Sequence, residues 1–350
     1  MKTGKAKNVL VCLFTAVFIS LCVPAVAADA VLDAVPSDIL FCARLNNFDY
    51  TLGQIDSFLS GVSPMGLSMI VRMRLAHMLG DPMLQGVDTA GSFVIFGRAE
   101  PEQTPGAEPD LFIAALLPVK NYDEFLETSP NIGSAGADGI SLIEVPSMFP
   151  VMDPNAPPPP PAATLLCTKA GNFALIGPEN KRAQIAAFAK SIGQSSLAKK
   201  IDADQAKQSS EMPIWLYADI DQVNKTFGEQ IEKAFANIDK KMATMQGGPQ
   251  MQNLDELMKV YLDIIKSFLQ QGKFVSFTLK PEPAILRIKE TLAAKPDTEL
   301  AALLQADASL PKENKLVAQL QGGSAVTAAF KVGRQDAEKS ISNFYPTAAS

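Results

Sequence analysis

The sequence predicts an α+β protein made of two tandem copies of a mainly antiparallel sheet with helices packed on one face. A stretch from Ile214 to Phe235 reads as a strand that turns directly into an amphipathic helix, and a similar stretch runs from Ile39 to Phe58. The strand-like runs that follow are joined by hairpin loops too short for parallel crossovers, which favours antiparallel pairing. A content of 47% hydrophobic and 19% charged residues is typical of a globular chain.

A constant offset in residue number, 214 − 39 = 175, relates the two copies. Four identical pairs that share this offset are Ile39 with Ile214, Ala43 with Ala218, Thr51 with Thr226, and Gly53 with Gly228. Phe274 in the second copy corresponds to Phe93 in the first at a larger offset, whereas Lys295 corresponds to Lys120 at the original offset. The hairpin loop that lies between these two positions is therefore six residues shorter in the second copy than in the first. A length change confined to a loop is what a folded duplication tolerates.

Each copy is expected to begin with a strand, continue with paired helices and return through hairpins. In the first copy we expect strands at 39–45, 93–98, 111–119, 139–145, 164–169 and 173–176, and helices that start at Asn46 or Asn47, at Ser63-Pro64, at Asn121 and at Pro178. In the second copy we expect strands at 214–220, 274–279, 284–290, 315–321 and 325–332, and helices at 221–242, 254–269 and 335–344. The second copy ends without a clear finishing element, as a truncated copy would.

The N-terminal segment 1–27 predicts a secretory signal peptide. Three lysines precede an apolar run from Val9 to Val23, and Ala25-Val26-Ala27 has the small-residue pattern of a cleavage site. The run is shorter than the ~20 apolar residues of a membrane-spanning helix, and Leu21 before Cys22 does not fit a lipoprotein signal. We therefore expect export to the periplasm or the extracellular space and no transmembrane segment after cleavage. The expected organisation is signal 1–27, first repeat 28–205 and second repeat 206–350.

The mature chain is acidic. Loss of the three signal lysines leaves 28 of the 31 basic side chains against 37 acidic ones, a net charge of −9. Such a balance argues against nucleic acid as a partner, because phosphate binding needs a basic surface.

Five consecutive prolines, Pro157 to Pro161, mark a proline-rich loop at 150–163. They favour an extended polyproline II segment and cannot continue a sheet or a helix. The segment is either a docking site for an aromatic-lined groove or a stiff loop between two strands, and the second interpretation is favoured for an exported chain.

Two cysteines remain after signal cleavage. Cys42 and Cys167 both lie in apolar, strand-like runs. Export permits a disulfide between them, and burial as two small hydrophobic side chains explains them equally well.

Most catalytic patterns lack the residues that would complete them. His77 is the single histidine and lies in an apolar helix, where a structural role is expected. Ser196 and Lys199 satisfy S-x-x-K, but the K-T-G partner occurs only within the signal peptide. Ser63 misses a G-x-S-x-G pattern by one residue and is expected to cap a helix.

Acidic pairs offer the remaining polar candidates. Asp219 with Asp221, and Asp202 with Asp204, could hold a divalent ion. The repeat aligns Asp219 with Arg44, which does not suit an ion site, and we expect Asp221 to cap the following helix. No phosphate-cradling glycine pattern is present, so the sequence indicates no nucleotide, cofactor or metal. Asn224-Lys225-Thr226 is a glycosylation sequon in a predicted helix and is regarded as incidental.

Methionines form the last signal. Met65, Met69 and Met73 make a stripe at four-residue spacing. Flexible thioethers can line an apolar ligand surface, but they also fill ordinary cores, and the core interpretation is favoured.

The opening Val35-Pro36-Ser37-Asp38-Ile39-Leu40, which leads from a signal peptide into a strand and helix, resembles that of uncharacterised exported repeat proteins of planctomycete-type bacteria. This resemblance implies no known activity. The leading hypothesis is a non-enzymatic cell-envelope protein with a binding or structural role, whose partner is another envelope protein or an apolar ligand. The alternatives are a carrier or chaperone for an apolar ligand in a methionine-lined groove and a hydrolase built on carboxylates such as Asp219.

Overall fold

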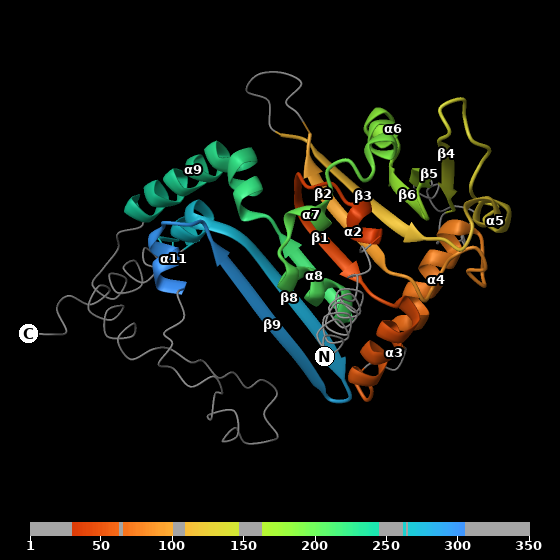
Figure 1. Ribbon diagram of the computed structural model, residues 1–350, viewed down its shortest axis with the longest axis horizontal. Coiled ribbons are helices and arrows are strands. Elements are labelled where there is room, and N and C mark those ends of the chain that lie inside the picture. Colours follow the sequence, from red (N-terminus) through yellow and green to blue (C-terminus); the bar gives the residue numbers. More distant parts are fainter. Residues whose placement is uncertain are drawn as a thin grey trace, which may run out of the picture. The chain divides into compact units, whose positions relative to one another are not determined.

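The computed structural model describes residues 30–62, 66–100, 109–146, 163–244, 262–263 and 265–304 (Figure 1). The helices are α2 (Ala30–Ala34), α3 (Phe48–Phe58), α4 (Leu67–Leu79), α5 (Tyr122–Thr128), α6 (Arg182–Ser191), α7 (Leu197–Lys200), α8 (Ala203–Glu211), α9 (Ile220–Thr244) and α11 (Glu299–Leu304). The strands are β1 (Ile39–Leu45), β2 (Phe93–Ala99), β3 (Leu111–Pro118), β4 (Ser141–Val145), β5 (Ala163–Ala170), β6 (Phe173–Pro178), β7 (Ile214–Ala218), β8 (Gly272–Glu282) and β9 (Ile285–Ala294).

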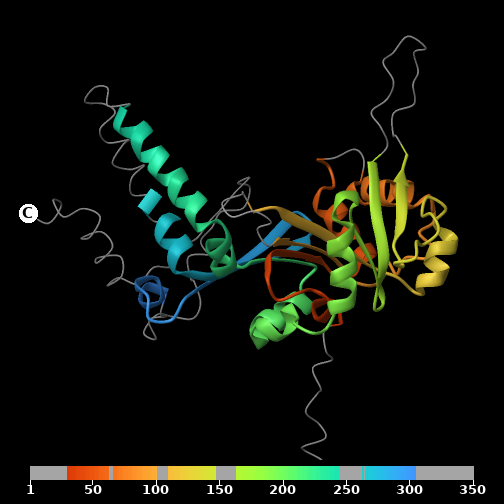
Figure 2. The ribbon, with the colours of Figure 1, turned by 90° about the horizontal axis from the view of Figure 1, so that it is seen from above.

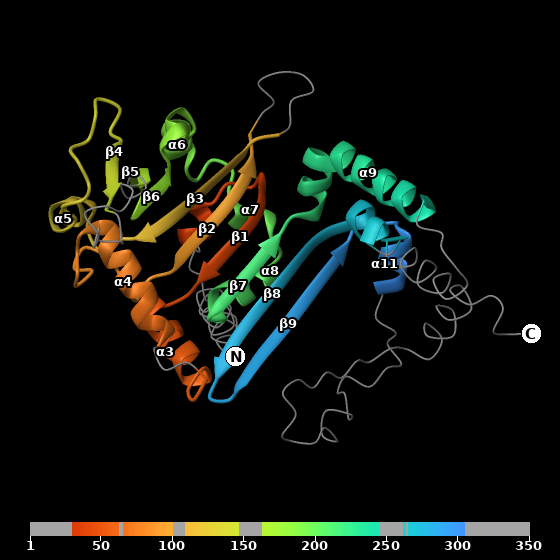
Figure 3. The same cartoon turned by 180° about the vertical axis from the view of Figure 1, so that it is seen from behind.

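The fold belongs to the α+β class, as the sequence predicts. The strands form one nine-stranded sheet in the order β4-β5-β6-β3-β2-β1-β7-β8-β9, where the sequence analysis expected a sheet in each copy. Antiparallel pairing joins β1 to β2, β2 to β3, β3 to β6, β6 to β5 and β5 to β4. Figure 3 shows β1, β2 and β3 side by side.

The chain divides into two compact units. Unit 1 takes in residues up to Tyr217 and Phe277–Lys289, and unit 2 takes in Ala218–Ser276 and the chain from Glu290 onward. These units are not the two predicted repeats, so the predicted boundary between residues 205 and 206 stays a prediction.

One face of the sheet in unit 1 carries a core that α4 and α5 cover. Alternate side chains of β4, β5 and β6 point to this face, among them Ile143, Cys167 and Ile176. Leu79 of α4 and Phe125 of α5 pack into the same cluster, and both are fully buried. The alternation of apolar residues in the strands therefore produces a continuous buried layer.

Helix α6 covers the opposite face. Its Phe188 packs against Phe96 of β2, with ring centroids 5.2 Å apart. Phe96 is paired with Ala114 of β3, and the next residue, Ala115, is paired with Ile176 of the core described above. Successive side chains of a strand point to opposite faces, so Phe96 and Phe188 lie on the face opposite to Ile176. Figure 2 shows α6 beside β5 and β6. Helices thus lie on both faces of the sheet in unit 1, where the sequence analysis expected them on one. Strand β6 explains the second layer, because its successive residues from Phe173 to Gly177 are buried whichever face they point to.

The two cysteines are buried and not bonded to each other. Cys42 lies on β1 and Cys167 on β5, and three strands separate them. Four strand spacings of about 4.8 Å amount to roughly 19 Å, far beyond the ~7 Å between Cα atoms that a disulfide spans. The disulfide that the sequence left open is therefore not formed. Both thiols are buried, and the Sγ of Cys167 lies 3.7 Å from the Tyr122 hydroxyl.

Unit 2 contains α9, the first residues of β8, the last residues of β9 and α11. The backbone N–H of Lys295 donates to the carbonyl of Gln271, and the Gln271 side chain accepts from the backbone N–H of Leu300. Asp221 on the first turn of α9 pairs with Lys295 at 2.9 Å and with Lys225 at 2.6 Å. These contacts join the start of α9 to the segment that leads into α11.

Some predicted features lie outside the described residues: Ser63 and Met65, the five prolines, most of the predicted helix 254–269, and the predicted strands and helix after residue 304.

Candidate binding surface

Helix α3 is anchored at its first turn. Asn47 precedes it with φ of 44°, and its side chain accepts a hydrogen bond from the backbone N–H of Tyr50, which confirms the predicted asparagine cap. Phe48 stacks on Phe93 of β2 with ring centroids 4.3 Å apart, and Leu52 is buried one turn later. The helix is thereby fixed to the sheet at its N-terminal half.

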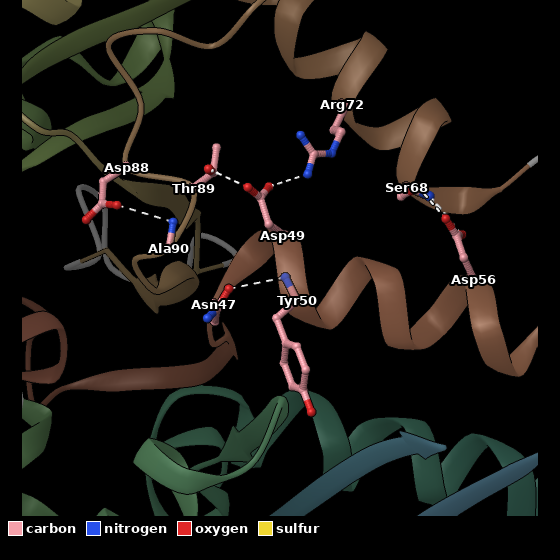
Figure 4. Close-up of polar contacts among 9 residues, drawn as sticks. All are labelled: Asn47, Asp49, Tyr50, Asp56, Ser68, Arg72, Asp88, Thr89 and Ala90. Carbon is pink, nitrogen blue, oxygen red and sulfur yellow. Dashed lines mark hydrogen bonds and ion pairs between the residues drawn. The ribbon is translucent and has the colours of Figure 1, made fainter. Parts of the chain in front are cut away.

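Polar contacts tie α4 to α3 (Figure 4). The Asp49 carboxylate accepts from Arg72 of α4 and from the Thr89 hydroxyl, the latter at 2.7 Å. Asp56 accepts from both the backbone N–H and the hydroxyl of Ser68 at the start of α4. The hydrogen bond from the Ser68 hydroxyl holds the pKa of Asp56 below its ordinary value, because it stabilises the charged form of the carboxylate.

The C-terminal end of α4 is fixed as well. Gly80 ends the helix with φ of 74°, a conformation that glycine adopts without strain. The Asn131 side chain donates to the carbonyl oxygens of His77 and Met78, at 2.9 and 3.2 Å. Both ends of α4 are therefore held by side chains of other elements.

The side chains that α4 exposes are unusual for a helix fixed in this way. Nine of its thirteen residues are apolar, yet Leu79 alone is buried. Met69 is 59% exposed and Met73, one turn later, is 46% exposed. A helix that is apolar on nearly all sides is normally buried on all sides, whereas the sheet can cover only one side of α4. We call Met69 and Met73, with the half-buried apolar residues beside them on α4, the α4 face.

The sequence prediction for the methionine stripe is thus corrected in part. Met69 and Met73 are not core residues, so the favoured core interpretation is wrong for these two. Met65, the third member of the stripe, lies outside the described residues.

The predicted capping role of Asp221 is also wrong. Strand β7 ends at Ala218, and α9 begins at Ile220, earlier than expected. Asp219 therefore occupies the cap position, and its side chain accepts from the backbone N–H of Gln222 at 2.8 Å. The side chain of Asp221 is instead engaged by Lys225 and Lys295.

The other polar candidates have structural partners. Ser196 is buried and its hydroxyl lies 3.2 Å from an Asp33 carboxylate oxygen, whereas Lys199 donates to the carbonyl of Gly193. Asp202 caps α8 by accepting from the Gln205 backbone N–H. Asn224 of the sequon lies within α9.

A pocket of about 270 Å³ is a second feature, and sequence reasoning missed it. It lies within unit 1 between the loop before β1, the end of β2 and the chain after α6, and its lining includes Ser37, Asp38, Arg98, Phe188 and Ser195. The backbone N–H of Ser37 donates to the Ser195 carbonyl at 3.1 Å, which fixes the two loops to each other. The pairing of segments far apart in the sequence creates this pocket, so no local pattern announces it.

Arg98 and Asp38 are the charged side chains of this pocket. Their closest nitrogen and oxygen atoms, Nη1 and Oδ2, are 3.7 Å apart. This separation is too long for a hydrogen bond, so the two groups attract each other without satisfying each other's hydrogen-bonding capacity.

Within the part of the chain that the structure describes, no three His, Cys, Asp or Glu side chains gather as a metal site. No helix in this part combines the length and the apolar character that crossing a bilayer requires. Comparison of the chain with protein-family models, with curated proteins and with solved structures finds no match.

Proposed function

We propose that this chain is an exported, non-enzymatic binding protein of the cell envelope, and that the α4 face docks another envelope protein. The observation that carries the proposal is the exposure of Met69 and Met73 on a helix of mainly apolar residues whose two ends are held in place. Met69 and Met73 are four residues apart on α4 and therefore adjoin on its surface, and contiguous exposed apolar surface is characteristic of interaction sites.

The chemistry of α4 indicates the kind of partner. Flexible methionine side chains adapt to partner surfaces of different shape. Arg72, Arg74 and His77 are the titratable residues of α4, which has no acidic residue, although the whole chain has a net charge of −6. A partner with an apolar patch bordered by acidic side chains would complement this helix.

Photo-crosslinking tests the proposal. A photoreactive amino acid placed at position 69 or 73 of the exported chain should yield one discrete adduct in intact envelopes. The matched control is position 83: Met83 is also a methionine and is 76% exposed, but it lies outside α4. The double variant Met69→Gln/Met73→Gln should weaken capture by a crosslinker placed at position 70, whereas Met83→Gln should not. Adducts of equal yield at positions 69 and 83, or none from α4, would overturn the proposal.

Export and duplication remain parts of the same proposal. N-terminal sequencing of the exported product should begin at Ala28 if the segment 1–27 is a signal peptide.

The order of elements supports two copies of one unit. The first series is β1, α3, α4, β2, β3, α5, and the series that begins after Pro213 is β7, α9, β8, β9, α11. The strands that open the two series begin at Ile39 and Ile214, which the sequence offset also pairs.

A carrier for an apolar ligand is the second candidate, because the same methionines could contact a small molecule. Such a carrier would be expected to enclose its ligand, whereas Met69 and Met73 lie on an exposed helix and no methionine lines the 270 Å³ pocket. The geometry therefore favours a macromolecular partner. Native mass spectrometry of the exported chain separates the two, since a carrier retains a small-molecule mass.

The carboxylate hydrolase is the weakest alternative. The aspartate suggested for it, Asp219, caps a helix. A pair of carboxylates that share one partner, Glu100 and Asp110, both accept hydrogen bonds from Lys181. Burial lowers the pKa of Lys181, but its hydrogen bonds to Asp110 and Glu100 outweigh this and raise it, so the lysine stays protonated between them.

A further inference from the structure

We propose that the pocket between Arg98 and Asp38 binds a small zwitterion, an α-amino acid with an apolar side chain. This site is separate from the α4 face and does not depend on the function proposed for it.

The charged end of the pocket matches both charges of such a ligand. Arg98 Nη1 and Asp38 Oδ2 lie 3.7 Å apart, and the Arg98 side chain is 26% exposed and that of Asp38 54% exposed. In an α-amino acid the ammonium nitrogen and the carboxyl carbon are about 2.5 Å apart, by ordinary backbone bond lengths and angles. A carboxylate placed at Arg98 therefore brings the ammonium next to Asp38, and the four charges then alternate in sign around a ring.

A ligand with a single charge fits this arrangement less well. An anion at Arg98 would also meet the carboxylate of Asp38, and a cation at Asp38 would also meet the guanidinium of Arg98. Hydrogen bonds in which both groups are charged are the strong ones. The zwitterion can form one such contact with each side chain without a repulsive neighbour.

The rest of the pocket suits a short apolar side chain. Ala34 and Phe188 are buried and supply its apolar wall, with Ile192 beside them. On the polar side, the hydroxyls of Ser37 and Ser195 are hydrogen-bonded to each other, and Gln194 adds an amide. The volume of about 270 Å³ is just below the ~300 Å³ at which pockets for drug-sized ligands begin. A single amino acid is of suitable size, and a long peptide is not.

The pocket is also built on fixed elements. Arg98 pairs with Ile39 in the β1–β2 ladder, and Pro36 forms a bridge to Ser196. The Lys200 ammonium donates to the Ser37 carbonyl at 2.7 Å, and the Leu197 backbone N–H donates to the Val35 carbonyl at 2.8 Å. The loops that hold Ser37 and Ser195 are therefore connected to each other before any ligand arrives, which reduces the entropy lost on binding.

Calorimetric titration of the exported chain with L-leucine, L-methionine and L-phenylalanine tests the proposal. We expect saturable binding of at least one of them. Two analogues of leucine that each lack one charge, 4-methylpentanoate and 3-methylbutylamine, should bind about tenfold more weakly or worse, since each loses a contact between charged groups.

Matched variants assign the two charges. Arg98→Gln should remove the preference for leucine over the amine, and Asp38→Asn should remove the preference for leucine over 4-methylpentanoate. Arg287→Gln is the control, because Arg287 is an exposed arginine paired with Glu282 away from this pocket. Circular dichroism checks that each variant is folded, and Arg98→Lys and Asp38→Glu replace any variant that is not.

The proposal is overturned if none of the three amino acids binds saturably at millimolar concentration. It is also overturned if a single-charge analogue binds as tightly as leucine, or if folded Arg98 and Asp38 variants bind leucine as the Arg287→Gln control does.

Discussion

The two junctions from strand to helix, β1 to α3 and β7 to α9, begin at matched positions and are built differently. Their strands start at the matched residues Ile39 and Ile214, but their helices start at Phe48 and Ile220, so α9 follows the start of its strand more closely than α3 does. Asn46 and Asn47 separate β1 from α3, whereas Asp219 alone separates β7 from α9. The second junction is therefore tighter.

Polar side chains at matched positions also have different roles. Arg44 is buried and donates from Nε to Asn46 Oδ1 at 2.6 Å, and Asn46 in turn donates to the Ser209 and Met212 carbonyls. The position matched to Arg44 is Asp219, a helix cap. The strand and helix pattern recurs because apolar spacing specifies it, whereas each polar network depends on which segments happen to lie beside the junction.

Of the substitutions proposed here, removal of Arg44 should lower the unfolding free energy most. Arg44→Met leaves the buried polar groups around Asn46 without a charged donor, and we expect a loss of about 3 kcal/mol in unfolding free energy. Urea denaturation followed by the fluorescence of Trp215 measures it, because this single tryptophan is fully buried in the adjoining strand β7.

Arg72→Met is the matched control for Arg44→Met. Arg72 and its partner Asp49 have side chains 43% and 41% exposed, so their ion pair should contribute less than about 1 kcal/mol. Equal losses of unfolding free energy for the two variants would show that the burial of the Arg44 network does not increase its contribution to stability.

The cap at the second junction should have the next largest effect. Asp219→Ala removes the acceptor of the Gln222 N–H, and we expect a loss of about 1–2 kcal/mol. Asp219→Asn keeps an acceptor oxygen and should lose less than about half of that. Helical circular dichroism during urea denaturation is the measurement, and an Asn variant as unstable as the Ala variant would contradict the capping role.

Apolar residues made much of this fold predictable. The alternating runs at 39–45, 93–98 and 111–119 became β1, β2 and β3 with nearly the expected bounds. Gly80, a residue type that often ends a helix, does end α4. Such features depend on local spacing, which the sequence displays directly.

Polar sites were less predictable for a physical reason. The cap moved from Asp221 to Asp219 because a small shift of a helix start changes which side chain faces the first turn. The exposure of Met69 and Met73 depends on what packs against α4, and the Arg98 pocket depends on pairing between distant segments. Both are tertiary properties that apolar spacing does not encode.

Asp221 should make the stability of the protein at the second junction depend modestly on pH. Hydrogen bonds from Lys225 and then Lys295 lower the pKa of Asp221 below its ordinary value of 3.8. Since the folded-state pKa is the lower one, this stabilisation is complete above about pH 4 and is lost as the pH falls through the folded-state value.

Asp221→Asn should therefore reduce the loss of stability on acidification below about pH 4. At neutral pH it should cost less than about 1 kcal/mol, because the Asp221 side chain is 32% exposed and solvent weakens the pairs. Urea denaturation at neutral pH and under acidic conditions near the folded-state pKa measures both. If the variant and the unmodified protein lose the same unfolding free energy between neutral and acidic pH, Asp221 is not a source of the pH dependence.

Glycine at the cap of the first junction should have the smallest effect. Asn47 has φ of 44°, whereas Asp219 is not among the described residues with positive φ. Asn47→Gly loses the hydrogen bond from Tyr50 but adopts positive φ freely, so we expect a change below about 0.5 kcal/mol. Asn47→Ala loses the same bond and also resists the left-handed conformation, and we expect a loss of about 2 kcal/mol. The gap between Ala and Gly variants should thus be wider at position 47 than at position 219, and gaps of equal size in urea denaturation would show that backbone conformation does not distinguish the two caps.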